Sequence, residues 1–154
     1  MDFETIKERV FNVVGAIYSV HQELGPGLNE RIYQEGLELE LKLNNIPFSR
    51  ELMVHPKYKG SEMKSEYRID FLCHNDIIVE CKALPELINI HRAQLFNYMR
   101  LLKKPCGVLA NFYPISAEVE RYFFDENQNE IVSWNGRVIN LARSITRPSH
   151  RIIK

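Results

Sequence analysis

The sequence predicts an α/β fold in which a central mixed β-sheet is flanked by helices. The first observation is the order of the predicted elements, which runs helix, helix, three strands, helix and then further strands. The second is that the third strand, the third helix and the next strand have the order of a β-α-β unit, whose two strands lie parallel in one sheet. Because the earlier strands are joined by short turns typical of antiparallel pairs, the sheet should be mixed.

The chain of 154 residues is expected to form one domain with its own hydrophobic core. The core should span about residues 5–122, and residues 125–154 should form a hairpin and a basic C-terminal extension. No apolar run approaches the roughly 20 residues needed to cross a bilayer, and the acidic N-terminus does not resemble a signal peptide. The scattered Cys73, Cys81 and Cys106 argue against a disulfide framework or a structural zinc site and favour the reducing cytoplasm.

The net charge of zero does not by itself indicate nucleic-acid binding, but the charges are unevenly distributed. Residues 137–154 contain no acidic side chain, and their basic side chains are Arg137, Arg143, Arg147, Arg151 and Lys154. The rest of the chain is therefore acidic. Such a tail is either a nucleic-acid-binding arm or a packed and solvated terminus, and both interpretations stay open.

The first predicted element is an amphipathic helix over residues 3–24. Its apolar side chains recur at spacings of three and four, Asp2 is a suitable N-cap, and a Gly-Pro-Gly stop follows at residues 25–27. The helix should therefore bury one continuous face.

A second helix is predicted from Asn29 to about Asn44. Its expected apolar positions are Ile32, Leu39 and Leu43. Gly36 inside this helix costs about 1 kcal/mol relative to alanine, so we expect it to mark close approach to a neighbouring element.

Strands are predicted for most of the remaining chain. Residues 51–58 should form a strand that ends in a turn at residues 59–60. Two apolar runs, 67–72 and 77–82, are joined by a short polar break and should form a hairpin. The later predicted elements are a helix from Pro85 to about Lys104, a strand at 106–112, and a hairpin of 118–124 with 130–134.

The central hairpin carries the residues that point most strongly to chemistry. Asp70 lies in its first strand, and Glu80-Cys81-Lys82 lies at the end of its second. Since side chains alternate along a strand, Glu80 and Lys82 should point to the same face while Cys81 points to the other. Asp70, Glu80 and the main-chain carbonyl of Cys81 supply three oxygens, the ligand type that Mg²⁺ prefers. Lys82 would orient the attacking water or stabilise charge that develops on phosphorus.

Two helices contribute further candidate residues. His91, Gln94 and Tyr98 share one face of the third helix, in line with apolar residues, so this face should lie against the protein. Glu30 and Tyr33 lie on one side of the start of the second helix. Each of these residues also has an ordinary structural explanation. His91 would be a core histidine whose hydrogen bonds are satisfied, and Tyr98 would be a half-buried tyrosine. Glu30 would be a carboxylate that the helix dipole favours in the first turn.

These residues together resemble the GxxExxY protein family, which belongs to the PD-(D/E)XK nuclease superfamily with the RecB-type nucleases and many restriction endonucleases. Residues 27–33 match the Gly-x-x-Glu-x-x-Tyr signature of the family. The resemblance covers about residues 5–122. Further matching segments follow in order at 58–60, 67–70, 79–82, 90–94, 97–98 and 107–112.

The resemblance implies a restriction-endonuclease-like core and a role for each matching residue. Asp70 and Glu80 would be ligands of Mg²⁺ or Mn²⁺, and Lys82 would be the catalytic lysine. Glu30 would be the helical carboxylate that precedes the core in RecB-like nucleases, and it is grouped with Asp70, Glu80 and Cys81 as a metal ligand. Gln94 and Tyr98 match a Gln-x-x-x-Tyr element that shapes the site and holds the substrate, and His91 and Tyr33 are grouped with them as substrate-binding.

The leading hypothesis is a Mg²⁺- or Mn²⁺-dependent nuclease that acts on DNA in defence, repair or recombination. A nucleic-acid-binding module that kept the fold without turnover is the second hypothesis, because the chain lacks the basic surface expected of many nucleases. A protein-interaction subunit of a larger assembly is the third. No membrane partner is expected, and a homodimer is compatible with each hypothesis.

Overall fold

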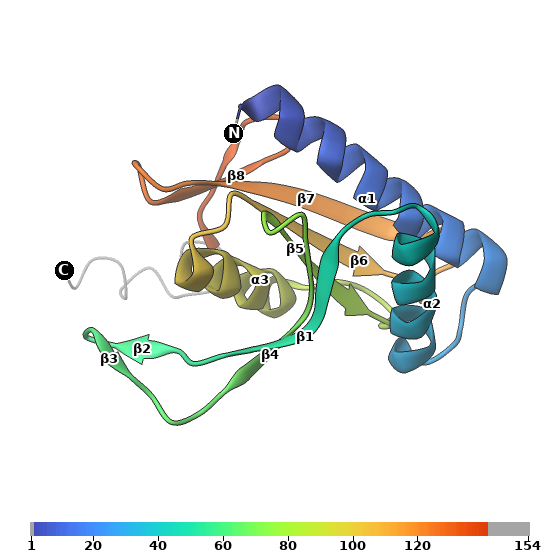
Figure 1. The fold of residues 1–154 in the computed structure, drawn as a ribbon, viewed down its shortest axis with the longest axis horizontal. Coiled ribbons are helices and arrows are strands. Elements are labelled where there is room, and N and C mark those ends of the chain that lie inside the picture. Colours follow the sequence, from blue (N-terminus) through green and yellow to red (C-terminus); the bar gives the residue numbers. More distant parts are fainter. Residues whose placement is uncertain (1, 142–154) are drawn as a thin grey trace.

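The computed structural model describes residues 2–141 (Figure 1). The helices within this part are α1 (Phe3–Leu24), α2 (Glu30–Leu43) and α3 (Asn89–Leu102). The strands are β1 (Phe48–Val54), β2 (Lys57–Tyr58), β3 (Ser61–Glu62), β4 (Tyr67–Cys73), β5 (Ile77–Lys82), β6 (Cys106–Asn111), β7 (Glu118–Asp125), β8 (Glu130–Ser133) and β9 (Val138–Ile139). Most of the predicted basic tail, residues 142–154, lies outside the described residues.

A mixed sheet of seven strands forms the centre of the fold, in the order β1-β4-β5-β6-β7-β8-β9. Strands β5 and β6 are parallel and are joined by α3, whereas the other neighbouring strands are antiparallel. The predicted α/β class and the β-α-β unit are therefore confirmed. Strands β2 and β3 form a separate two-stranded ribbon that projects beyond β1 and β4 (Figure 1). Its tight turn is the predicted one, at Lys59 and Gly60.

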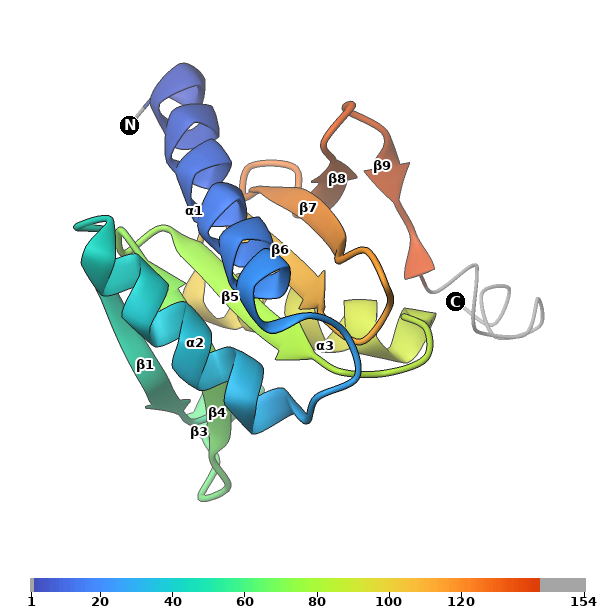
Figure 2. The same ribbon diagram turned by 90° about the vertical axis from the view of Figure 1, so that its right-hand side faces the viewer.

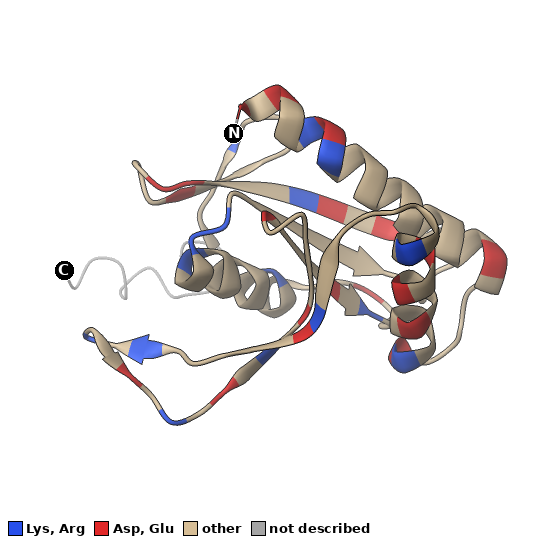
Figure 3. Ribbon diagram, viewed as in Figure 1, with Lys and Arg blue, Asp and Glu red and all other residues tan. Residues whose placement is uncertain are grey.

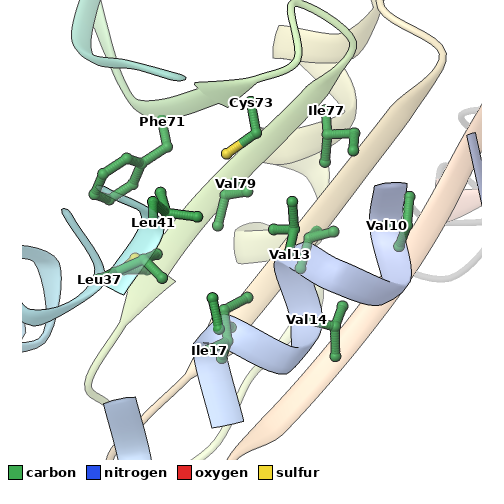
Figure 4. Packing of buried hydrophobic residues seen from close by; sticks show 14 of the residues in the cluster. Val10, Val13, Val14, Ile17, Leu37, Leu41, Phe71, Cys73, Ile77 and Val79 are labelled. Atoms are coloured by element: carbon green, nitrogen blue, oxygen red, sulfur yellow. The ribbon is translucent and has the colours of Figure 1, made fainter. Parts of the chain in front are cut away.

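Helices α1 and α2 cover one face of the sheet, and α3 covers the other (Figure 2). The predicted apolar stripe of α1, which includes Val10 and Ile17, packs against the sheet with Phe71 and Val79 (Figure 4). On the opposite face, the core between α3 and the sheet includes Leu95. Strand β5 lies between the two cores, so five of its six residues are buried.

The buried face of α2 differs from the predicted one. The positions expected to be apolar and inward are at least partly exposed, at 38%, 63% and 76% for Ile32, Leu39 and Leu43. The positions that are buried instead are Tyr33, Leu37 and Leu41. Both stripes satisfy helical periodicity, and packing against α1 and the sheet selects between them.

Gly36 marks the close contact between α2 and α1, as predicted. A Cβ atom at this position would lie 3.1 Å from side-chain carbons of both Val20 and Leu24. The absence of a side chain at Gly36 therefore sets how closely the two helices approach, and so where the start of α2 lies over the sheet.

Two predicted boundaries are wrong. Strand β1 begins at Phe48, three residues before the predicted start. Helix α3 begins at Asn89 rather than near Pro85, because the preceding loop is tied to the sheet. Asn111 Oδ1 accepts a hydrogen bond from Leu84 N–H at 3.0 Å, and Asn111 Nδ2 donates to the Leu84 carbonyl at 2.8 Å. These bonds fix the loop at the end of β5 to the sheet.

Basic and acidic residues are interspersed along most elements rather than separated into two faces (Figure 3). None of the helices among residues 2–141 is long and apolar enough to span a bilayer. The three cysteines are buried thiols within the core.

Candidate active site

Strand β4 loses its regular pairing at Asp70. On one side, the ladder with β5 ends at the pair of Phe71 and Val79. On the other, the ladder with β1 is interrupted opposite Asp70 at Glu51, whose φ of 56° is unusual for a residue other than glycine. Asp70 therefore lies where β4 separates from β5 and where its pairing with β1, which resumes at Leu52 and Ile69, is interrupted.

The carboxylates of Asp70 and Glu80 replace the missing ladder bonds. Asp70 N–H donates to Glu80 Oε2 at 2.9 Å, and Cys81 N–H donates to Asp70 Oδ2 at 2.8 Å. Each carboxylate is thus fixed by the backbone of the opposite strand, and the two side chains lie next to each other at the end of the hairpin.

Side chains that alternate along β5 point to opposite faces of the sheet, so the core residues and the candidate catalytic residues lie on different sides. Val79 and Cys81 contribute to the core under α1 and α2. The Lys82 side chain lies on the α3 side, where Nζ donates to Gln94 Oε1 at 3.0 Å. The Cys81 sulfur is therefore in the core, which leaves only the main chain of this residue available at the site.

Burial of these acidic groups changes their protonation. Glu80 is only 4% exposed, and burial together with the charge of Asp70 raises its pKa to about 8. Burial also raises the pKa of Asp70, against the opposing effects of the Cys81 N–H and the Lys82 charge. Two acidic groups are thus held close together in a poorly solvated place, where ionising both is unfavourable, an arrangement typical of functional sites.

Glu30 approaches the same place from the start of α2. Burial and then the charge of Asp70 raise the pKa of Glu30, while Lys82 opposes the rise. Glu30 Oε2 accepts a hydrogen bond from Gln34 Nε2 at 2.9 Å. Within residues 2–141, no three His, Cys, Asp or Glu side chains gather as a ready-made metal cluster. Glu30 is therefore near the pair of carboxylates without completing a three-carboxylate ligand set.

Three residues of α3 form a wall beside Lys82. His91 Nδ1 accepts a hydrogen bond from Ile88 N–H at 3.0 Å, which caps the helix, and the nearby Lys82 charge adds to burial in lowering the His91 pKa. Tyr98 is 3% exposed, and its ring packs edge to face against Tyr67, with ring centroids 5.4 Å apart. Burial, followed by the charges of Glu80 and Asp70, raises the pKa of Tyr98 to about 12. The structure thus brings His91, Gln94 and Tyr98 to the site.

Tyr33 has a different role from the predicted one. Its side chain is fully buried and stacks on Phe112, with ring centroids 4.8 Å apart. Its hydroxyl donates to the Gly25 carbonyl at 2.6 Å and accepts from Leu28 N–H at 3.0 Å. A side chain without accessible surface cannot contact substrate. Tyr33 instead fixes the loop that leads into α2 and so positions Glu30.

Replacing Tyr33 with phenylalanine should therefore act on stability. We expect the free energy of unfolding to fall by about 1–2 kcal/mol, because two backbone groups lose their hydrogen-bond partner. Urea unfolding followed by circular dichroism measures the change. Tyr18→Phe is the matched control, since Tyr18 is 46% exposed and lies on α1. Equal stability of the two variants would contradict this role.

A polar cavity of about 300 Å³ adjoins Asp70, and the sequence did not point to it. It is lined by Glu30, Gln34 and Asp70 and by three arginines, Arg31, Arg50 and Arg68. Spacing along the sequence could have indicated two of these arginines, since Arg68 precedes Asp70 by two residues in one strand and Arg31 follows Glu30 directly. The contribution of Arg50 depends on the pairing of β1 with β4, which spacing does not reveal.

Comparison with solved structures relates the chain to a crystal structure of SSO0001, with a TM-score of 0.51 and 24% sequence identity. The match covers 64% of this chain and 52% of that one, so the chain spans about half the length of the solved structure. This likeness concerns the fold alone. Comparison with curated proteins gives no significant match.

Comparison with protein families gives a match over residues 7–122 to the model of the PD-(D/E)XK nuclease superfamily. The matched segment runs from within α1 into β7 and contains the interrupted strand β4, the paired carboxylates and the lysine described above. The chain belongs to the PD-(D/E)XK nuclease superfamily.

Proposed function

We propose that the chain is a divalent-metal-dependent nuclease that hydrolyses phosphodiester bonds, with DNA as its substrate. The observation that carries the proposal is the loss of regular pairing at Asp70, where the Asp70 and Glu80 carboxylates replace the ladder bonds between β4 and β5, next to Lys82. Membership of the nuclease superfamily supports the reaction type. The DNA substrate rests on the resemblance to RecB-type nucleases and restriction endonucleases.

The donor set at this end of the sheet fits Mg²⁺ or Mn²⁺. Asp70, Glu80 and the Cys81 carbonyl offer oxygens only, and these cations usually retain several water ligands, so few protein ligands are needed. Burial raises the pKa values of both carboxylates, and the charge of Asp70 adds to the rise at Glu80, so ionising both groups is unfavourable. When bound, the cation would supply the positive charge that offsets the negative charge of the carboxylates and the Lewis acidity for phosphodiester hydrolysis.

Lys82 and the α3 wall then act on the substrate. Because Gln94 Oε1 holds Lys82 Nζ, the ammonium group has a defined position beside the carboxylates. From there it orients the attacking water and stabilises the charge that develops on the phosphate oxygens. We assign His91 to substrate contacts on the same side, the almost fully buried Tyr98 to shaping this wall of the site, and Glu30 to an electrostatic role at the site.

A cleavage assay tests the proposed function. Purified chain, shown to be folded by circular dichroism, is incubated with single-stranded DNA, double-stranded DNA or RNA in the presence of Mg²⁺, Mn²⁺ or EDTA. Cleavage of DNA with either metal and its loss in EDTA are expected. Absence of cleavage of every substrate with both metals would contradict the proposal. Salt-dependent binding without turnover would instead favour the catalytically silent binding module.

Metal binding should also stabilise the fold. At a metal concentration about a hundredfold above the dissociation constant, we expect Mg²⁺ or Mn²⁺ to raise Tm by about 5–10 °C. Asp70→Asn should remove most of this shift, because one carboxylate ligand is lost while an oxygen remains for the Cys81 N–H. Differential scanning calorimetry of both chains measures the shift, and an equal shift in both would place the metal elsewhere.

Gln94→Ala should lower kcat about 10- to 100-fold, because Lys82 Nζ loses the acceptor that positions it. Single-turnover cleavage at saturating DNA measures the effect. Asn97→Ala is the control on the exposed face of the same helix and should leave the rate near that of the unchanged chain. If both variants behave alike, Lys82 does not depend on Gln94.

A further inference from the structure

The cavity beside Asp70 is lined by three arginines and three acidic residues, and two of these arginines are not engaged by the described part of the chain. Among residues 2–141, the Arg31 and Arg68 side chains form neither an ion pair nor a hydrogen bond, and both residues are exposed. Exposed arginines without partners are common on protein surfaces. Here, however, both guanidinium-bearing side chains line one cavity, and that cavity opens beside a proposed catalytic carboxylate.

Arg50 supplies an independent observation at the same cavity. Its Nη1 donates to Glu38 Oε1 at 2.6 Å, which anchors the side chain to α2. Its Nε is nevertheless the only buried side-chain nitrogen or oxygen within the described residues that lacks a hydrogen-bond partner. A buried donor without an acceptor is costly, so the guanidinium group of Arg50, which lines the same cavity, is incompletely satisfied by the chain itself.

Acidic residues also line the cavity, and they limit what it would accept. Glu30 is engaged by Gln34, and Asp70 by the Cys81 N–H. Glu51 also lines it, at the interruption of β1. A fully desolvated anion would meet these carboxylates, whereas a solvated, singly charged phosphodiester would contact the arginines at the rim.

We propose that Arg31 and Arg68 bind a second phosphate of the nucleic-acid strand whose scissile phosphodiester lies at Asp70 and Glu80. Planar guanidinium groups match the geometry of phosphate oxygens with two parallel hydrogen bonds. The proposal rests on the proposed nuclease function for the position of the scissile bond. It adds a subsite, formed by the start of α2 and by β4, that sets how the strand runs across the site.

Binding measured without cleavage tests this subsite. Fluorescence anisotropy of a labelled single-stranded DNA is recorded across a salt series in EDTA, with full-length chain carrying Arg31→Ala, Arg68→Ala or both. Each substitution should weaken binding about three- to tenfold, and each should make the slope of log K against log salt shallower by about 0.7. Circular dichroism confirms that each variant is folded, which is expected because both side chains are exposed.

Lys103→Ala is the matched control, because it removes one positive charge from a 70% exposed side chain at the far end of α3. It should leave the affinity and the salt slope close to those of the unchanged chain. Arg68→Lys keeps the charge but loses the paired hydrogen bonds, so its affinity for DNA should lie between that of the unchanged chain and that of Arg68→Ala.

Cleavage kinetics separate this subsite from the proposed catalytic residues. The double variant should raise KM about tenfold or more with little change in kcat, since the subsite binds a phosphate that does not react. If the unchanged chain cleaves DNA but the double variant matches Lys103→Ala in affinity and salt slope, the subsite is wrong while the nuclease function stands. If arginine-dependent binding occurs without cleavage under either metal, the phosphate site is supported and the nuclease function fails.

Discussion

Lys82→Ala is expected to lower kcat for DNA cleavage by about 10²- to 10³-fold. The reason is that its ammonium group, held by Gln94, is the positive side chain beside the paired carboxylates, where charge would develop on the phosphate. The substrate affinity should change much less, because the loss falls on an interaction that strengthens in the transition state. Single-turnover cleavage with excess enzyme measures the rate without interference from product release.

Two further variants decide how that loss is interpreted. Lys103→Ala removes an equivalent charge far from the site and should retain full activity. Lys82→Arg retains the positive charge but not the compact ammonium group, so recovery of only part of the rate would indicate that position matters as well as charge. Activity of Lys82→Ala close to that of Lys103→Ala would show that Lys82 is not catalytic.

The core of the site was predictable because it depends on local sequence. Asp70 and Glu80 lie on two strands joined by a short turn, so hairpin pairing alone brings them together. Alternation along β5 assigns Cys81 to the core, and helical spacing places Gln94 and Tyr98 on one face of α3. None of these inferences requires knowledge of how distant elements pack.

The parts that were missed depend on long-range contacts. Helix α2 carries two apolar stripes, and its contact with α1 at Gly36 selects the stripe that contains Tyr33. Tyr33 was therefore predicted to contact substrate, although it is buried against Phe112. The late start of α3 depends on Asn111, which is 27 residues from its partner Leu84.

The arginine cavity was also beyond local inference. It requires α2 to lie over the interrupted pairing of β1 with β4, so that Arg31, Arg50 and Arg68 meet there from three elements. The positive φ of Glu51, which accompanies the interruption, has no sequence signal such as glycine or asparagine. Features built from a backbone irregularity and a distant helix are seen only in the folded chain.

The second large effect concerns Glu80 and the stability of the metal-free chain. The pKa of Glu80 is raised from an ordinary 4.5 to about 8 on folding, so the unfolded chain releases this proton first as the pH rises. The folded state should therefore lose stability between about pH 4.5 and pH 8. Glu80→Gln removes the titrating charge and keeps an oxygen for the Asp70 N–H. We expect it to be more stable than the unchanged chain by about 1–3 kcal/mol at pH 8 in EDTA, with little difference at pH 5.

Glu120→Gln is the matched control for Glu80→Gln, because the same replacement of Glu by Gln should change the stability at pH 8 in the opposite direction. Glu120 accepts two hydrogen bonds from Arg92, both at 2.7 Å. Burial raises the pKa of Glu120, but the hydrogen bonds from Arg92 and Tyr122 and the charge of Arg92 together lower it below its ordinary value. Its contribution to stability is present at high pH and is lost on acidification, so Glu120→Gln should destabilise the chain at pH 8.

Urea unfolding at pH 5 and pH 8 compares the stabilities of the two variants with that of the unchanged chain. Because both lose one negative charge, a general electrostatic effect would move them together. Stabilisation by Glu80→Gln alone would show that the folded chain holds Asp70 and Glu80 together at a cost that a bound cation would relieve.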